Sequence, residues 1–294
     1  MARPVRFRVV PHEEGVMLGQ LIARRLPGMT VEQGKELVRA GAVYMGHLRM
    51  RVPTVRVVAG ERITVYPQAL ADQELPAGII QIVWRDRDFV VLDKPAGVPV
   101  SATRESARGT LSEGLRRTLA AEGVERPYVG LVHRLDRGAS GLVLFTVRSM
   151  ANISVHKQFT EHSIDRIYRV RVHGETPDEF ECQAPVLELH SGTSKIAPES
   201  PHARAAATRF RRLQASVAIA GTSLVEATLE TGRHHQIRVH AAHLGHPVLG
   251  DLRYGRDDGA GRLHLHAAVL RMAHPQDGRP IEVAAALPDW ARDD

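Results

Sequence analysis

The spacing of apolar residues changes about a quarter of the way along the chain. In residues 15–26 (GVMLGQLIARRL) apolar side chains recur near the 3.6-residue period of a helix, and a Pro-Gly pair ends that pattern. Thr30 and Gln33 have the spacing of a capping box, which predicts the start of a second helix. Short apolar runs punctuated by glycines follow and predict strands and turns. We therefore expect a small domain of helices and short strands over residues 1–67.

From residue 79 onwards the predicted elements are longer, and helices lie between strands. Residues 68–78 (QALADQELPAG), which come before them, are polar and contain Pro and small residues, so we interpret them as a linker. The mixture predicts the α+β class, with a mixed, mostly antiparallel sheet and flanking helices. Strands are expected at 79–86, 89–95, 140–148, 164–174 and 224–231, and helices at 110–123, 149–162 and 235–245.

The composition places the chain among ordinary globular proteins. It has 294 residues, of which 43% are hydrophobic and 24% charged. No apolar run approaches the roughly 20 residues of a membrane helix, and the N-terminus lacks the pattern of a signal peptide. Cys182 is the single cysteine, which excludes an intrachain disulfide and fits a reducing compartment. We expect a cytoplasmic protein that does not associate with membranes.

The positive charge is concentrated at the N-terminus. The net charge is +6, and residues 1–67 hold eleven Lys and Arg against five Asp and Glu. Such a basic region favours a polyanionic partner, most simply nucleic acid, although a high arginine background is the alternative. The candidate phosphate contacts are Arg24, Arg25, Lys35, Arg39, Arg49 and Arg51.

One aspartate lies among arginines between two apolar runs, in GLVHRLDRGASGLVLF (130–145). In an extended chain Arg134 and Asp136 share one face, because side chains alternate. A neighbouring guanidinium favours the ionised form of an aspartate, which can then act as a nucleophile or stabilise charge. Gly138 and Gly141 allow a tight turn and the close approach of a ligand. A structural Arg–Asp pair at a strand end is the alternative interpretation.

A second polar cluster lies in LETGRHHQIRVHAAHLGHPVLGDLRYG (229–255). Its histidines raise a metal hypothesis, but His235 and His240 are five residues apart, and no Glu completes an HExxH motif. His240 and His243 have no accompanying cysteine or carboxylate cluster. Polar helix contacts or RNA contacts are the preferred interpretation over a metal-dependent hydrolase. The chain also lacks the glycine-rich motifs of nucleotide cofactors and the G-x-S-x-G of serine hydrolases, so no cofactor is expected.

These two segments resemble signatures of the RluA-type RNA pseudouridine synthases. HRLDRGASGL (133–142) is similar to HRLDxxTSGL, and GRHHQIRVH (232–240) is similar to GRTHQIRVH. Two departures are Ala139 in place of Thr and His234 in place of Thr. Four further segments resemble the family in the same order: VVLDKPAGVPV (90–100), Arg166-Ile167-Tyr168, GHPVLGDLRYG (245–255) and RLHLHAAVLRMAHP (262–275).

The resemblance implies a domain organisation. The pseudouridine synthase fold would occupy residues 79–288 and leave a tail at 289–294. In the N-terminal piece, AGAVYMG (40–46) and VVAGERITVYP (57–67) resemble the alpha-L RNA-binding motif. That motif implies a small α/β RNA-binding domain over the N-terminal residues.

The resemblance also implies an activity and its residues. The family isomerises uridine to pseudouridine in structured RNA without a cofactor. Asp136 is implied as the essential carboxylate, Arg238 as the basic residue that orients it, and Tyr168 as the ring that stacks on uracil. The implied substrate-binding residues are Arg134, Arg233, His235 and Gln236.

The implied partner is RNA. Large-subunit ribosomal RNA is the expected substrate, because an N-terminal basic domain usually accompanies it in this family. A transfer RNA substrate is the alternative, and a non-catalytic RNA-binding or ribosome-assembly protein is a second one. We expect a monomer that needs no protein partner.

Overall fold

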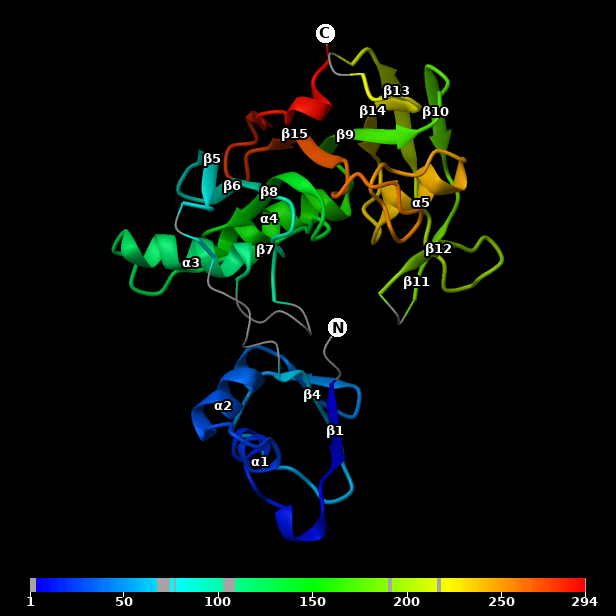
Figure 1. The fold of residues 1–294 in the computed structure, drawn as a ribbon. Coiled ribbons are helices and arrows are strands. Elements are labelled where there is room, and N and C mark those ends of the chain that lie inside the picture. The colour runs from blue at the N-terminus through cyan, green and yellow to red at the C-terminus, as the bar shows by residue number, and fades with distance from the viewer. Residues whose placement is uncertain are drawn as a thin grey trace. The chain divides into compact units, whose positions relative to one another are not determined.

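The computed structural model describes residues 4–67, 75–76, 78–102, 109–189, 192–215 and 218–293, so most of the expected linker 68–78 lies outside the described residues. The chain forms two compact units (Figure 1). One comprises Met1–Ile79 with Pro99–Gly123, and the other comprises Ile80–Val98 with Val124–Asp294. The division groups Pro99–Gly123 with the N-terminal unit, although the sequence analysis assigned this segment to the catalytic domain.

The N-terminal unit packs two helices against a four-stranded antiparallel sheet of order β1-β4-β2-β3. The capping box predicted at Thr30 is confirmed, because Thr30 accepts from the Gln33 N–H and Gln33 accepts from the Thr30 N–H. A side chain at Gly34 would lie 2.3 Å from the carbonyl oxygen of Gly19, so glycine allows the two helices to approach closely. The elements are β1 (Val5–Arg8), η1 (Pro11–Glu13), α1 (Leu18–Arg25), α2 (Val31–Arg39), β2 (Val43–Met45), β3 (Leu48–Met50), β4 (Arg62–Val65) and α3 (Leu111–Ala121).

The second unit is built on a ten-stranded sheet in which β10-β13-β14-β9-β15-β8-β6-β5 follow one another, with β16 paired to β15 and β7 paired to β8. The β15–β8 pairing is parallel and the others are antiparallel. The predicted α+β class and mixed, mostly antiparallel sheet are therefore confirmed. The strands are β5 (Gln81–Arg85), β6 (Phe89–Lys94), β7 (Gly130–Leu131), β8 (Ser140–Thr146), β9 (Asp165–His173), β10 (Glu179–Cys182), β13 (Thr208–Leu213), β14 (Thr222–Leu229), β15 (Leu265–Ala273) and β16 (Pro280–Ala284).

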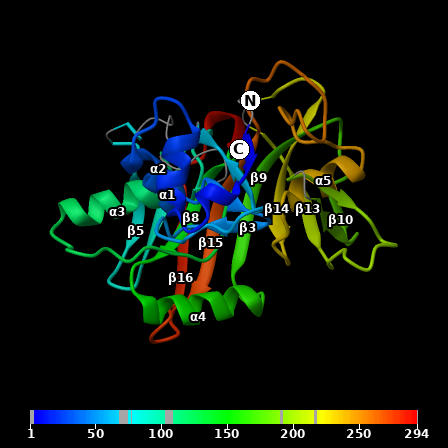
Figure 2. The same ribbon diagram turned by 90° about the horizontal axis from the view of Figure 1, so that it is seen from below.

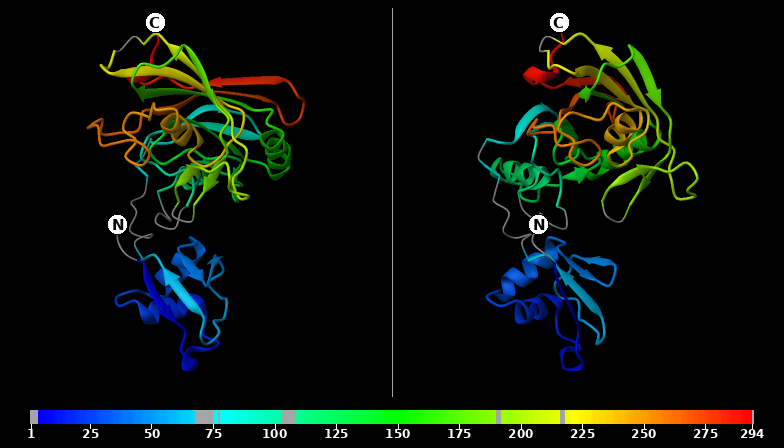
Figure 3. Two further views of the ribbon diagram at one scale, coloured as in Figure 1. Left: turned by 90° about the vertical axis from the view of Figure 1, so that its right-hand side faces the viewer. Right: turned by 45° about the vertical axis from the view of Figure 1, so that its right-hand side comes forward.

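Two helices cover this sheet. The helix α4 (Ser149–Thr160) packs beside β7 and β8, whereas α5 (Gln236–His243) packs against β13 and the small sheet of β11 (Val186–Glu188) and β12 (Ser194–Ile196) (Figures 2 and 3). The apolar core on the α4 side includes Phe89, Val91, Leu142, Leu144, Val155, Ile164 and Leu270. In the described part of the chain no helix is long and apolar enough to cross a membrane.

The expected tail at 289–294 is corrected by the structure. Within this segment Asp289–Ala291 form the short helix η3, and Trp290 is only 5% exposed. The Trp290 carbonyl accepts hydrogen bonds of 3.2 and 2.8 Å from Nε and Nη2 of Arg171, and its ring meets His264 edge-on. The sequence did not predict this contact, because a single aromatic residue forms no periodic pattern. The buried Trp290 packs this last helical segment against β9.

Candidate active site

Asp136 lies in the loop between β7 and β8, which is held by backbone contacts. The Ala139 N–H donates to the carbonyl of Asp136 (3.1 Å), and the next carbonyl, that of Arg137, accepts from the Gly97 N–H (2.8 Å). At the far end of the loop a side chain on Gly141 would lie 2.2 Å from the backbone oxygen of Ala267. Glycine at this position therefore allows β8 to approach β15, which fixes where the Asp136 loop begins and ends.

Lys94, at the end of β6, holds the same loop through its side chain. Its ammonium donates to the carbonyl oxygens of Pro95 (2.9 Å), Val98 (2.7 Å) and Arg137 (3.0 Å). Burial lowers the pKa of Lys94 to about 7, but three acceptors around one nitrogen favour the protonated form. We conclude that Lys94 joins the turn after β6 to the loop that carries Asp136.

The guanidinium of Arg238, from α5, is shared between two carboxylates. Nε and Nη2 donate to Oδ2 and Oδ1 of Asp251, both at 2.7 Å, whereas Nη1 donates to Oδ2 of Asp136 at 2.9 Å. Against the effect of burial, these carboxylates raise the pKa of Arg238. The arginine therefore stays charged and presents Asp136 in one orientation.

The second oxygen of Asp136 faces His235 rather than an arginine. Nε2 of His235 lies 3.7 Å from Oδ1 of Asp136, too far for a hydrogen bond. The Tyr254 oxygen accepts from the Ser194 N–H (2.7 Å) and lies 2.8 Å from Nδ1 of His235. We assign the hydroxyl hydrogen of Tyr254 to this second contact, so that Nδ1 accepts and the ring hydrogen is on Nε2, which faces Asp136. Burial lowers the pKa of His235 to about 4, so the ring is neutral near pH 7.

Tyr168, in the middle of β9, belongs to the same cluster. Its side chain is largely enclosed, and the residue is 6% exposed. Burial raises the pKa of Tyr168, while Arg166 lowers it and the charge of Asp136 raises it further. The phenol is thus protonated at neutral pH and lies within electrostatic reach of Asp136. The cluster offers one fixed carboxylate, one aromatic surface and one neutral N–H donor.

Comparison with known proteins identifies the family to which this cluster belongs. The sequence model described as RNA pseudouridylate synthase matches residues 88–243, which include Asp136, Tyr168 and Arg238. The chain belongs to the RNA pseudouridylate synthase family. The predicted family is confirmed, and the protein is an RNA pseudouridine synthase, an isomerase.

The relatives and structures agree over most of the chain. The synthase is 32% identical to a ribosomal large subunit pseudouridine synthase D of Zymomonas mobilis, over 93% of this chain and 91% of that protein. It is also 32% identical to a ribosomal large subunit pseudouridine synthase C of Yersinia pestis, over 95% of this chain and 91% of that one. The solved structure of human RNA pseudouridylate synthase domain containing 1 is 27% identical and has a TM-score of 0.60, covering 72% of this chain and 86% of that one.

The expected substrate-binding residues of the synthase differ in whether their side chains are available to a substrate. Arg134 is exposed next to Asp136 in sequence, and His235 faces Asp136 directly. Arg233 uses Nε to donate to the carbonyl of Ala205 (2.9 Å). These three positions are compatible with a role at the substrate, which stays a prediction.

Gln236 is a correction. It is 2% exposed, and its amide oxygen accepts from Thr231 and from the Arg233 N–H, while its nitrogen donates to Ala207 and Thr208. All four hydrogen-bonding positions of the amide are used within the protein, so none is left for a substrate. Gln236 instead fixes the loop that leads into α5.

The expected RNA contacts of the N-terminal unit divide in a similar way. Arg25 donates two hydrogen bonds to Glu13, which is buried, and Nε of Arg49 donates to the carbonyl of Gly41 at 2.6 Å. Each of these contacts engages part of a guanidinium inside the N-terminal unit, and the role of both arginines as phosphate contacts stays a prediction. Lys35 and Arg39 both pair with the exposed Glu32, whereas Arg24 and Arg51 are exposed.

The histidines of segment 229–255 do not converge on a metal site. His240 is fully buried, with Nδ1 bonded to the Thr208 hydroxyl (2.9 Å) and Nε2 to the carbonyl of Ala184 (3.0 Å). With both ring nitrogens hydrogen-bonded, His240 has no lone pair free for a cation.

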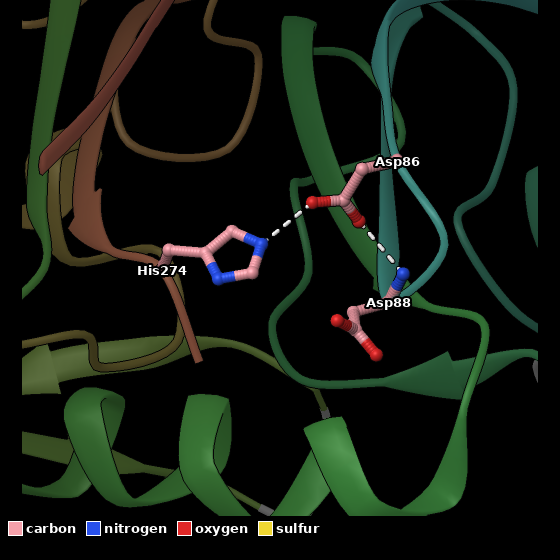
Figure 4. Close-up of side chains that lie close together, drawn as sticks. All are labelled: Asp86, Asp88 and His274. Atoms are coloured by element: carbon pink, nitrogen blue, oxygen red, sulfur yellow. Dashed lines mark hydrogen bonds and ion pairs between the residues drawn. The ribbon is translucent and has the colours of Figure 1, made fainter. Parts of the chain in front are cut away.

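A cluster of metal-ligand types lies elsewhere, where Asp86, Asp88 and His274 come within 4.8 Å of one another (Figure 4). Nε2 of His274 donates to Oδ2 of Asp86 (2.7 Å), and Oδ1 of Asp86 accepts from the N–H groups of Asp88 (2.7 Å) and Phe89. Nδ1 of His274 accepts from the Gln276 N–H. These bonds close the turn between β5 and β6 and engage Asp86 and His274, whereas Oδ2 of Asp88 is buried without a hydrogen-bond partner among the described residues.

Sequence reasoning gave no role to several residues that build the site, namely Lys94, Ser194, Asp251 and Tyr254. Three of them lie in segments already identified as similar to the family: Lys94 in VVLDKPAGVPV (90–100), and Asp251 and Tyr254 in GHPVLGDLRYG (245–255). The signal was therefore present for these three residues. The contacts of the last two with Arg238 and His235 become visible only in three dimensions.

Proposed function

We propose that this synthase isomerises uridines of large-subunit ribosomal RNA, with Asp136 as the reacting carboxylate. The named relatives that cover nine tenths of the chain are ribosomal large subunit enzymes, which supports this substrate. The observation that carries the role of Asp136 is its unequal environment. Arg238 holds Oδ2, and among the described residues no hydrogen bond reaches Oδ1.

The reaction needs a fixed carboxylate with one unengaged oxygen. The C1′–N1 bond breaks, the uracil turns, and a C1′–C5 bond forms, while a proton leaves C5 and one is taken up at N1. Asp136 could attack C1′, add to the uracil ring or abstract a ribose proton, and each step requires the ionised form. No electrons are exchanged with another molecule. The reaction therefore needs the types of side chain that this cluster contains, and no redox group.

The other residues support this role of Asp136. Arg238 orients the carboxylate and keeps it charged. The ring of Tyr168 offers a surface on which a flipped uracil stacks, typically worth about 1–3 kcal/mol per base. Flipping the base costs a few kcal/mol, and the exposed Arg134 is available to fill the vacated space.

The N-terminal unit would add phosphate contacts. Its net charge supports salt-dependent binding, to which the exposed Arg24 and Arg51 contribute. The cytoplasmic location and the monomeric state expected from the sequence stay predictions.

Pseudouridine mapping tests the proposal. Large-subunit ribosomal RNA transcripts and bulk transfer RNA are incubated with the wild-type protein and with Asp136→Asn, and pseudouridines are located at single-nucleotide resolution. We expect new pseudouridine in the ribosomal transcript with the wild-type protein and none with the variant. Modification of transfer RNA alone would overturn the substrate, and modification by Asp136→Asn at the wild-type rate would overturn the role of Asp136.

A further inference from the structure

Arg166, on β9, is a buried cation without a counterion. The residue is 8% exposed, and within the described part of the chain it makes no ion pair or hydrogen bond. Its Nε is enclosed without any partner. Two residues further along the strand, Tyr168 shares its face of the sheet, because side chains alternate along a strand.

A second buried arginine on the same strand shows how this protein satisfies a structural guanidinium. Arg171 is 1% exposed, but Nε and Nη2 donate to the carbonyl of Trp290, and Nη1 reaches the Thr222 hydroxyl at 3.4 Å. Burying a cation without such partners costs free energy, and unsatisfied buried groups cluster at functional sites. Arg166, by contrast, has N–H donors that no group of the described chain uses.

Two neighbours define the surroundings of the Arg166 guanidinium. Its Cζ lies 5.5 Å from the ring centre of Phe159, which covers one side with an apolar surface. On another side Nη1 lies against the backbone of Gly232, where an added Cβ would come within 2.5 Å of it. Gly232 directly precedes the loop that carries His235, so the guanidinium lies beside the loop that faces Asp136.

We propose that Arg166 binds a carbonyl oxygen of the target uracil and stabilises the negative charge that develops on the base. This inference rests on the proposed function. When the C1′–N1 bond breaks, its electron pair stays on the uracil, and the charge is shared by N1 and the two carbonyl oxygens. The N–H groups of Arg166 donate to one of those oxygens. The negative charge leaves the base when C5 forms its bond to C1′, and the later loss of the C5 proton is balanced by uptake of a proton at N1. Arg166 keeps all its protons throughout.

The enclosure of Arg166 favours the base over a backbone phosphate. Phosphates of a bound RNA stay at the protein surface, where exposed side chains such as Arg134 and Arg137 can reach them. The flipped base is the part of the substrate that enters the protein. It would lie on Tyr168, which responds to the charges of both Arg166 and Asp136.

Three variants separate charge stabilisation from other roles. Arg166→Met removes the charge but keeps an apolar chain of similar length, Arg166→Lys keeps the charge, and Gly232→Ala displaces the guanidinium without removing it. Each is measured for the single-turnover rate at saturating ribosomal RNA, for RNA affinity as a function of salt, and for thermal midpoint.

We expect Arg166→Met to lower the single-turnover rate about 10²–10³-fold, the usual effect of losing one donor to a developing oxyanion. RNA affinity should stay within about twofold, and the thermal midpoint should not fall, because an unpaired buried charge has been removed. Arg166→Lys should recover part of the rate, and Gly232→Ala should lose about tenfold with the fold intact.

Three results would overturn the inference. An unchanged rate in Arg166→Met would show that the charge is not used. Weaker binding with a smaller salt dependence and an unchanged rate would indicate a phosphate contact. A lower midpoint together with a proportional loss of rate and affinity would indicate a structural role. If the wild-type protein modifies no RNA, the proposed function fails as well, whereas failure in Arg166→Met alone leaves it intact.

Discussion

The two carboxylates that share Arg238 differ in how completely the protein uses them. The side chain of Asp251 is fully enclosed, and its oxygens accept both hydrogen bonds from Arg238 and those of the Arg253 and Tyr254 N–H groups. Although burial raises it, these bonds hold the pKa of Asp251 below its ordinary value. Asp136 is 18% exposed, and Arg238 binds one of its oxygens. The saturated carboxylate is a scaffold, and the partly free one is available for chemistry.

Among the variants that test this difference, we expect Asp251→Asn to have the largest effect on the unfolding free energy. Arg238 would keep its charge and lose its buried partner, which costs about 3–5 kcal/mol of unfolding free energy. Urea denaturation measures this loss, and the exposed Glu199→Gln serves as the control, with a change of about 0.5 kcal/mol or less. A loss below 1 kcal/mol in Asp251→Asn would show that Asp251 is not the scaffold described here.

Arg238→Lys tests whether one guanidinium must serve both carboxylates. A lysine ammonium keeps the charge but cannot span two partners in a fixed plane. Asp136 would then be misplaced, and we expect the single-turnover rate to fall about 100-fold with little change in RNA affinity. A rate within threefold of the wild type would mean that the positive charge alone matters, and that the planar arrangement of guanidinium N–H groups does not.

Tyr254→Phe tests the other oxygen of Asp136. Without the hydroxyl, Nδ1 of His235 loses its donor, and the ring can exchange its hydrogen between the two nitrogens. We expect a smaller effect on rate, about tenfold, because one hydrogen bond of the supporting shell is lost. Nitrogen-15 spectra of the labelled ring should show the Nε2–H form in the wild type and a mixture in the variant. Identical spectra would contradict the hydrogen-bond chain from Ser194 through Tyr254.

Acid stability provides a separate test, and three buried histidines contribute to it. Burial lowers the pKa of His133 to about 3 and those of His235 and His266 to about 4. The unfolded chain takes up protons near pH 6.5, whereas the folded one does so only near pH 3–4, so stability falls as the pH decreases through this window.

His133→Gln keeps an acceptor for the Leu144 N–H and removes one of these titrations. The unfolding free energy, measured between pH 7 and 4, should therefore fall less steeply than in the wild type. The exposed His202→Gln is the control and should leave the slope unchanged. Equal slopes for wild type and His133→Gln would refute this origin of the acid sensitivity.

The local sequence was sufficient to predict the residues of the reacting cluster. It was insufficient to predict which residues hold that cluster in place. Asp136 and Arg238 lie in distinct motifs whose residue types already suggest chemistry, and the structure brings them to 2.9 Å. Gln236 lies in the same motif as Arg238 and is also polar, but two of its four internal hydrogen bonds go to Ala207 and Thr208, which lie 29 and 28 residues earlier in the chain. A motif shows which polar side chains are candidates for a site. It does not show which of them already have all their hydrogen-bond partners within the protein.

The fold shows the same limit. The class and the mostly antiparallel sheet were predicted from longer apolar runs such as the one that became β8. The strand β13 (TRFRRL) was missed because three arginines interrupt its apolar pattern. Those arginines are solvated or paired, as Arg211 is with Glu226. The alternation of buried and exposed residues in β13 becomes apparent only once the strand is seen to pair with β14.

The most direct test of the account is the single-turnover formation of pseudouridine by Asp136→Asn, with ribosomal RNA as the substrate and the enzyme in excess over it. The variant keeps the shape of the side chain and the contact with Arg238 but lacks the charge. The account predicts RNA affinity and unfolding free energy close to those of the wild type, and a rate at least about 1,000-fold lower. A rate within tenfold of the wild type, with binding and stability intact, would contradict the assignment of Asp136 as the reacting carboxylate.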